Sequence, residues 1–234
     1  MARIAKIDNV TKKRFERKEK KRAVSTKTRK VYFLIVCEGE KTEPNYFQAL
    51  KDSLPDRTVL VTDMTIKGTG KNTISLVDFT IKHRDAHLQK FDRVWVVFDK
   101  DSFTDDQFNT AIAKAENNGI QVAWSNEAFE IWFLLHFEYV NHAMPREDYQ
   151  KGLERSIDKA RGVPGYTYKK NAQDTFDLIN SLGSQNQAIG WAKKISKLHE
   201  GSKFAKHNPC TTVYLLIEEL NDPESVLKIV EEGR

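Results

Sequence analysis

Two continuous apolar runs constrain what this chain can fold into more than any other feature. The first is Val31–Cys37, and the second follows Arg93 and ends at Phe98. Both are rich in β-branched and aromatic residues, and neither alternates with polar residues, which is typical of strands buried on both faces of a sheet. Segments with helical periodicity separate the runs. Strands that alternate with helices predict an α/β fold with a parallel sheet flanked by helices.

The same patterns predict the elements one by one. The expected strands are Val31–Cys37, Thr58–Ile66, Arg93–Phe98 and Ile120–Trp124. The expected helices between them are Thr42–Leu50 with Thr42 as N-cap, Asn72–Leu88, Asp105–Asn117, and one that is capped by Ser125 or Asn126 and runs to Phe137. Further along, the pattern is helical over Pro145–Arg161, Ala172–Ser181, Gln185–Leu198 and Thr211–Leu220, with a short helix after Pro223.

These elements divide the chain into three parts. Residues 1–30 form a basic, flexible arm, residues 31–138 an α/β core, and residues 139–234 a helical C-terminal lobe that packs on the core. The arm holds 13 Lys and Arg against three acids, a net charge of +10, whereas the whole chain has +5, so residues 31–234 carry −5. A dense run of like charges is neutralised well by a polyanion, which favours nucleic acid over an acidic protein surface as the partner of the arm. The basic residues of the expected contact are Lys12, Lys13, Arg14, Arg17, Lys18, Lys20, Lys21 and Arg22.

Several classes of protein are excluded by what the sequence lacks. The longest apolar run has seven residues, whereas a membrane span needs about 20. Two cysteines do not suffice for a disulfide scaffold or a zinc cluster, so we expect a cytoplasmic protein with reduced thiols and no membrane partner. The segment Gly68–Thr73 lacks the residues of a Walker A loop, which argues against ATP binding by this chain.

Acidic residues follow the two buried strands and carry the expected chemistry. Glu38 comes directly after the first strand, and the second run ends in Asp99-Lys100-Asp101. Ligands of parallel sheets collect at the carboxyl ends of the strands. If the strand geometry continues, its period of two places Asp99 and Asp101 on one side. Carboxylates gathered there favour Mg²⁺ or Mn²⁺, although acids at strand ends are also ordinary solvated turn residues.

Glu130 is an acid in an apolar setting. The segment Phe129–Phe137 is apolar around nearly its whole circumference, so a helix there is buried. A buried carboxylate requires a partner, which is either a Lys or Arg side chain or a metal ion.

The sequence also resembles a known family. The string Cys37-Glu-Gly-Glu-Lys-Thr-Glu-Pro-Asn-Tyr-Phe47 is similar to the opening motif of the RloB-like family. Later motifs of that family are matched by Val94–Asp101, Ser125–Trp132, Leu134–Phe137, Asn208-Pro209 and Thr211–Val213. The family is related to the Toprim fold of topoisomerases, primases and OLD-type nucleases.

The resemblance implies a metal-dependent nuclease. It implies that Glu38, Asp99 and Asp101 hold Mg²⁺ and that Glu130 completes the catalytic set. It further implies an effector of phage defence or abortive infection that cuts RNA, in some relatives tRNA, or DNA, often beside an ATPase partner. We expect Glu40 or Glu43 to help position the attacking water.

Two basic residues extend the expected site. Lys169 and Lys170 are expected to contact the nucleic acid and to neutralise charge in the transition state. A second interpretation is a non-catalytic subunit that binds nucleic acid or a nucleotide and regulates an ATPase partner.

Overall fold

One sheet of five strands organises the molecule. The computed structural model describes residues 30–232 except 57, 59–61, 89 and 102. The described strands are β1 (Val31–Cys37), β2 (Thr62–Gly68), β3 (Arg93–Asp99), β4 (Gln121–Asn126) and β5 (Cys210–Thr211), in the order β2-β1-β3-β4-β5. The first four run parallel, and β5 pairs antiparallel with β4. The prediction of a mostly parallel α/β sheet is confirmed.

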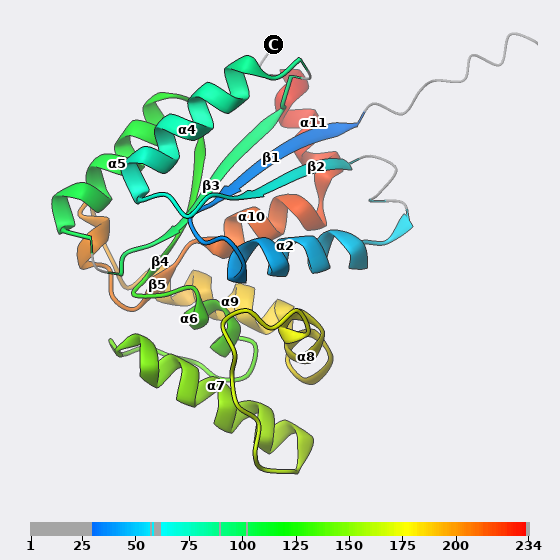
Figure 1. Cartoon of the computed structure of the whole chain (residues 1–234), viewed down its shortest axis with the longest axis vertical. Helices are drawn as coiled ribbons and strands as arrows, with labels where there is room; N and C mark the ends of the chain where they lie inside the picture. The colour runs from blue at the N-terminus through cyan, green and yellow to red at the C-terminus, as the bar shows by residue number, and fades with distance from the viewer. Residues whose placement is uncertain (1–29, 57, 59–61, 89, 102, 233–234) are drawn as a thin grey trace, which may run out of the picture.

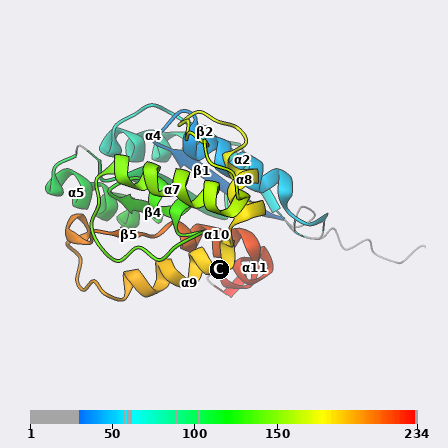
Figure 2. The ribbon, with the colours of Figure 1, turned by 90° about the horizontal axis from the view of Figure 1, so that it is seen from below.

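Helices cover both faces of this sheet (Figure 1). On one face lie α4 (Thr73–Ala86) and α5 (Asp105–Asn117), which contact each other and the central strands. The opposite face is covered by α2 (Thr42–Ser53), α10 (Val213–Asn221) and α11 (Pro223–Glu232). Figure 2 shows these two groups of helices on the two sides of the sheet. Because both faces are covered, the central strands are almost wholly apolar and buried.

The remaining helices gather beyond one end of the sheet, in the lower part of Figure 1. They are α6 (Glu130–Leu134), α7 (Arg146–Arg161), α8 (Thr175–Leu182) and α9 (Gln185–Ser196), followed by the 3₁₀ turn η1 (Phe204–Lys206). Helix α6 contacts α7 and α9, and α8 contacts α2. Helices α6 and α7 approach each other closely at Gly152 of α7, where an added Cβ would lie 3.0 Å from Leu134 Cδ2 of α6. No helix in the described part of the chain is long and apolar enough to cross a membrane.

The sequence predictions were most accurate where the signals are local. The strand Val31–Cys37 and the helix Asp105–Asn117 have the predicted bounds. Thr104 begins α5 with a capping box, in which its side chain and that of Gln107 bond each other's backbone N–H groups.

Three predictions about element ends were wrong. The second strand begins at Thr62, not Thr58, and extends to Gly68. Thr42 is not an N-cap, because its Oγ1 donates to the Lys170 carbonyl oxygen, 2.7 Å away, and Lys41 takes the cap position. Ser125 and Asn126 do not cap a helix, because they belong to β4 and pair with β5. Their side chains bond Thr211 and the Ala205 carbonyl instead.

The helix predicted to reach Phe137 is also much shorter than expected. Helix α6 spans only Glu130–Leu134, although the residues around it are buried as predicted. The apolar pattern correctly predicted a buried segment, but it overestimated the length of the helix.

The end of β2 is pressed against the loop that follows β1. A Cβ added at Gly68 would lie 2.7 Å from the Gly39 carbonyl oxygen and 2.8 Å from Glu40 Cα. Backbone hydrogen bonds hold the two loops together, since Gly70 N–H donates to the Glu38 carbonyl at 2.8 Å. Gly68 therefore fixes the position of the loop that carries Glu38.

We expect Gly68→Ala to lower the free energy of unfolding by about 1–3 kcal/mol, because the methyl group meets backbone that has no room to move aside. The matched control is Gly190→Ala in α9, where an added Cβ meets nothing within 4 Å. Alanine favours the helix there, so the control should gain about 0.5–1 kcal/mol. Urea denaturation of both variants and the wild type measures the difference. Equal stability of the two variants would contradict the close approach at Gly68.

Candidate functional site

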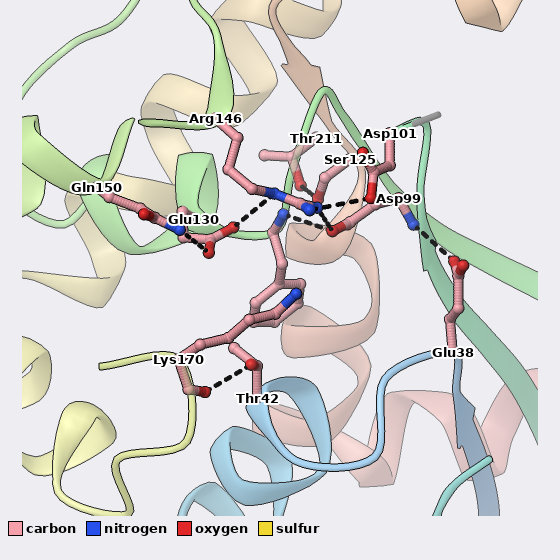
Figure 3. Close-up of polar contacts among 11 residues, drawn as sticks. Glu38, Thr42, Asp99, Asp101, Ser125, Glu130, Arg146, Gln150, Lys170 and Thr211 are labelled. Carbon is pink, nitrogen blue, oxygen red and sulfur yellow. Dashed lines mark hydrogen bonds and ion pairs between the residues drawn. The ribbon is translucent and has the colours of Figure 1, made fainter. Parts of the chain in front are cut away.

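The carboxyl ends of β1 and β3 bring two acidic residues together. Glu38 follows β1, and its backbone N–H donates to the Val97 carbonyl of β3 at 2.9 Å. Asp99 ends β3, and its backbone N–H donates to Glu38 Oε2 at 3.4 Å. The prediction that these two strand ends meet is therefore confirmed (Figure 3).

Asp99 lies at the centre of the site. Its side chain accepts from the Phe129 backbone N–H at 3.0 Å and from Arg146 Nη2 at 3.1 Å, both through Oδ2. The other oxygen, Oδ1, is buried and has no hydrogen-bond partner. Burial and the nearby Glu43 and Glu130 raise the pKa of Asp99 well above its usual value. This carboxylate is held in place and lacks enough positive charge around it.

Asp101 reaches the same site by a turn and not by a continued strand. Strand β3 ends at Asp99, and Asp101 has a φ of 30°, in the left-handed region. Its backbone N–H donates to the Glu127 carbonyl at 3.1 Å, which ties the turn to the segment after β4. The carboxylate accepts from Arg146 Nη1 at 2.9 Å. Asp99 and Asp101 thus do share one side, for a reason other than strand periodicity.

Glu130, at the start of α6, is 1% exposed, as the sequence predicted of a buried acid. Its Oε1 accepts from Gln150 Nε2 at 2.9 Å, and its Oε2 lies 3.8 Å from Arg146 Nε. The sequence left open whether the partner of Glu130 is a Lys or Arg side chain or a metal ion, and the structure shows an Arg side chain, that of Arg146, beside it.

Arg146 joins these acids, and sequence reasoning missed it. Its guanidinium forms ion pairs with Asp99, Asp101 and Glu130 (Figure 3). Gln150 was missed as well and lies one turn later on the same helix, α7. Two features of the sequence could have led to these residues. A buried Glu130 requires a cation as partner, and an Arg and a Gln lie four residues apart at the start of the next helix. Lys100, which lies between the two aspartates in sequence, pairs with Asp105 instead, at 3.4 Å.

Glu43, in the first turn of α2, is a further buried acid. Its side chain is 6% exposed, and its Oε2 is buried without a hydrogen-bond partner. A Cβ at Gly39 would collide with that oxygen, so a side chain at this position would have to displace the Glu43 carboxylate. Burial raises the pKa of Glu43, and the positive charges of Lys170 and Arg146 oppose the shift. We call Glu38, Glu43, Asp99, Asp101 and Glu130 the carboxylate cluster.

The other predicted site residues have varied positions. Lys169 and Lys170 are exposed, in the loop between α7 and α8, and the Lys170 carbonyl accepts from Thr42 (Figure 3). Glu40 is exposed and lies beside Gly70. His136, which is not one of the predicted site residues, is buried, bonds the Trp132 carbonyl at 2.9 Å and has its pKa lowered by burial to about 4, so it is neutral. The eight basic residues predicted between Lys12 and Arg22 lie outside the described residues.

The carboxylate cluster has the donor chemistry of a site for a hard divalent cation. Carboxylate oxygens are the ligands that Mg²⁺ and Mn²⁺ prefer, and two buried oxygens, on Asp99 and Glu43, lack partners. In the described part of the chain, however, no three acidic, His or Cys side chains are arranged so that they could hold an ion as they stand. Arg146 occupies the space between the aspartates. The donor set of the cluster therefore suits a metal ion in its chemistry, but the present arrangement of the side chains does not.

The pKa of Glu38 predicts a pH dependence of stability. Burial, with repulsion from Glu43 and Asp101, raises this pKa from 4.5 to about 7. Between pH 4.5 and about 7, Glu38 is therefore protonated in the folded state and ionised in the unfolded state. For this reason the free energy of unfolding falls as the pH rises through this range. In EDTA we expect the free energy of unfolding of Glu38→Gln to lack this part of the pH dependence. At pH 8 it should be about 1–2 kcal/mol higher than that of the wild type, a value discounted for partial exposure.

Urea denaturation at four pH values from 4.5 to 8 tests this expectation. Glu116→Gln, an exposed substitution on α5, serves as the control and should keep the wild-type slope. Identical slopes for Glu38→Gln and the wild type would contradict the raised pKa.

Comparisons with known proteins give one match. No curated protein and no solved structure matches this chain. The family model described as RloB-like protein matches residues 33–220, which include most of β1, the whole carboxylate cluster, Arg146 and β5. On this match, which covers most of its length, the chain belongs to the RloB-like family.

Proposed function

We propose that this protein is a metal-dependent nuclease that acts on nucleic acid, RNA or DNA, as an effector in phage defence. The observation that carries the proposal is the carboxylate cluster, where acids from β1, β3, α2 and α6 meet at the carboxyl edge of a parallel sheet. Acids that converge and retain unpartnered buried oxygens destabilise a protein unless a cation binds them. Because the cluster lowers the stability of the folded protein, we infer that it serves to bind a cation and not to support the fold.

A relationship to the Toprim fold is part of this proposal. It is supported by the parallel strand order β2-β1-β3-β4, with a glutamate after β1 and an Asp-x-Asp at the end of β3. We assign Glu38, Asp99 and Asp101 as ligands of Mg²⁺ or Mn²⁺. A cation there supplies charge to polarise a phosphodiester and to lower the pKa of an attacking water.

The protein's own residues have separate tasks in this proposal. The Phe129 backbone N–H holds the Asp99 carboxylate in position, and the Asp99 backbone N–H holds the Glu38 carboxylate. Glu130 is fixed by Gln150 and orients the cationic groups between itself and Asp99. We assign Lys169 and Lys170, which are exposed in the loop between α7 and α8, to contacts with phosphates of the nucleic acid. The basic arm supplies further phosphate contacts, and an ATPase partner regulates the activity.

The test is direct incubation of the purified protein with total tRNA and with supercoiled plasmid, in Mg²⁺, in Mn²⁺ and in EDTA. Cleavage in metal and none in EDTA is the expected result, and the substrate that is lost identifies the class. The proposal is contradicted if both substrates stay intact with both metals, and also when the ATPase partner is added.

A second candidate function is favoured by one observation, the Arg146 guanidinium that already pairs with three carboxylates. On this alternative the protein binds nucleic acid or a nucleotide without cutting and regulates an ATPase. Retention of intact tRNA or plasmid in a gel shift, unchanged by EDTA, would support it over the nuclease.

A further inference from the structure

Arg146 contacts more acids of the carboxylate cluster than any other cation that the described residues show there. Its Nη1 lies 2.9 Å from Asp101 Oδ2 and its Nη2 3.1 Å from Asp99 Oδ2. These are the oxygens of the Asp-x-Asp motif that a metal ion would also use. A guanidinium that lies between two carboxylates takes the place of a metal ion there, but it carries a charge of +1 whereas a divalent metal ion carries +2.

The fit of the guanidinium is incomplete. Arg146 Nε is buried and makes no hydrogen bond, although it lies 3.8 Å from Glu130 Oε2. Asp99 Oδ1 and Glu43 Oε2 are also buried without partners. A buried donor or acceptor that lacks a hydrogen-bond partner destabilises the folded state. A cation of higher charge and with more than two ligand positions would satisfy this site better than Arg146 does.

The first turn of helix α7 is less buried than the later turns, since Glu147 and Asp148 are exposed. Arg146 is the first residue of α7, and no side chain caps this end of the helix. The buried residues Gly152, Leu153 and Ile157 hold the later turns against α6 and the core, and the buried Tyr149 side chain marks the end of the first turn. In the first turn only two amides, of Asp148 and Tyr149, bond the Pro145 carbonyl, at 3.0 and 3.4 Å. Figure 3 shows Arg146 reaching into the cluster from this end of the helix.

We propose that Arg146 and a divalent cation bind Asp99 and Asp101 in a mutually exclusive way, so that metal binding releases the first turn of α7 from the carboxylate cluster. The inference rests on the metal site of the proposed function and adds a competitor supplied by the chain itself. The apparent affinity for metal is then reduced by the fraction of molecules in which Arg146 is bound.

The test is the affinity for Mn²⁺, measured from the electron paramagnetic resonance signal of the free ion. We expect Arg146→Gln to bind Mn²⁺ at least about tenfold more tightly than the wild type, because the competitor is gone. Arg155→Gln is the matched control, since it removes the same charge from an exposed position on the same helix. It should bind within about twofold of the wild type if the effect is local.

The outcomes separate this inference from the proposed function. If the wild type binds Mn²⁺ and Arg146→Gln binds it no more tightly than Arg155→Gln, the competition is refuted and the metal site stands. If none of the three proteins binds Mn²⁺, the metal site itself is refuted, and the competition with it.

A second measurement needs no variant. Hydrogen exchange of the wild type should become faster at the amides of Asp148 and Tyr149 when Mn²⁺ replaces EDTA, since their bonds to Pro145 open. Exchange in the later turns of α7 should not change. Unchanged or slower exchange in the first turn, in protein that has bound Mn²⁺, would overturn the inference even if Arg146→Gln fails to fold.

Discussion

Asp99→Asn is expected to reduce metal-dependent cleavage by about a thousandfold or more and to leave the fold intact. Asparagine has the shape of aspartate and can still accept from the Phe129 backbone N–H, but it lacks the negative charge that binds a cation. The charge it removes is a costly one, because burial raises the pKa of Asp99. The free energy of unfolding in EDTA should therefore change by no more than about 1 kcal/mol.

Initial rates on whichever nucleic acid the wild type cuts, at saturating Mg²⁺, measure the effect. Circular dichroism and a urea titration show whether the variant is folded. The control is Asp106→Asn, an exposed change in the first turn of α5 that should keep full activity. More than a tenth of the wild-type rate in Asp99→Asn, with the same requirement for metal, would remove Asp99 from the site.

Metal binding should raise the melting temperature of the wild type by about 5–10 °C. A ligand at about 100 times its dissociation constant stabilises the folded state by about 2.7 kcal/mol, and for a chain of this size each kcal/mol raises the melting temperature by about 2–4 °C. Because Glu38, with a pKa of about 7, must be ionised to bind a cation, the shift should be larger at pH 8 than at pH 6.

Thermal melts with Mn²⁺ and with EDTA at these two pH values test the expectation. Asp99→Asn should lose most of the shift, and Asp106→Asn should keep it. An equal shift in both variants would place the metal elsewhere on the protein.

The parts of the fold that the sequence predicted depend on short-range signals. The bounds of β1 follow from seven consecutive β-forming residues, and those of α5 from the Thr104 capping box. The errors have long-range causes. Ser125 and Asn126 continue β4 because Cys210 and Thr211 pair with them, and a two-residue strand leaves no periodic pattern in a sequence.

The same division holds for the candidate site. Glu38 and Asp99 could be placed together because adjacent parallel strands end at the same edge of a sheet. The burial of Glu130 followed from its apolar neighbours, and so did its need for a partner. That the partner is Arg146, 47 residues beyond Asp99, depends on how α7 packs on α6, and no local pattern encodes it.

The two helices α10 and α11 bear on the order in which the protein acquires its structure during synthesis. They cover one face of the sheet, and Glu219 of α10 accepts from Trp95 Nε1 at 3.0 Å and pairs with Arg93 at 3.1 Å, both on β3. A nascent chain that has emerged only as far as β4 has all four parallel strands, but on this face it has only α2 and lacks α10 and α11. The ribosome must release about another hundred residues before the sheet is covered, so the chain is open to aggregation and to chaperones throughout that interval.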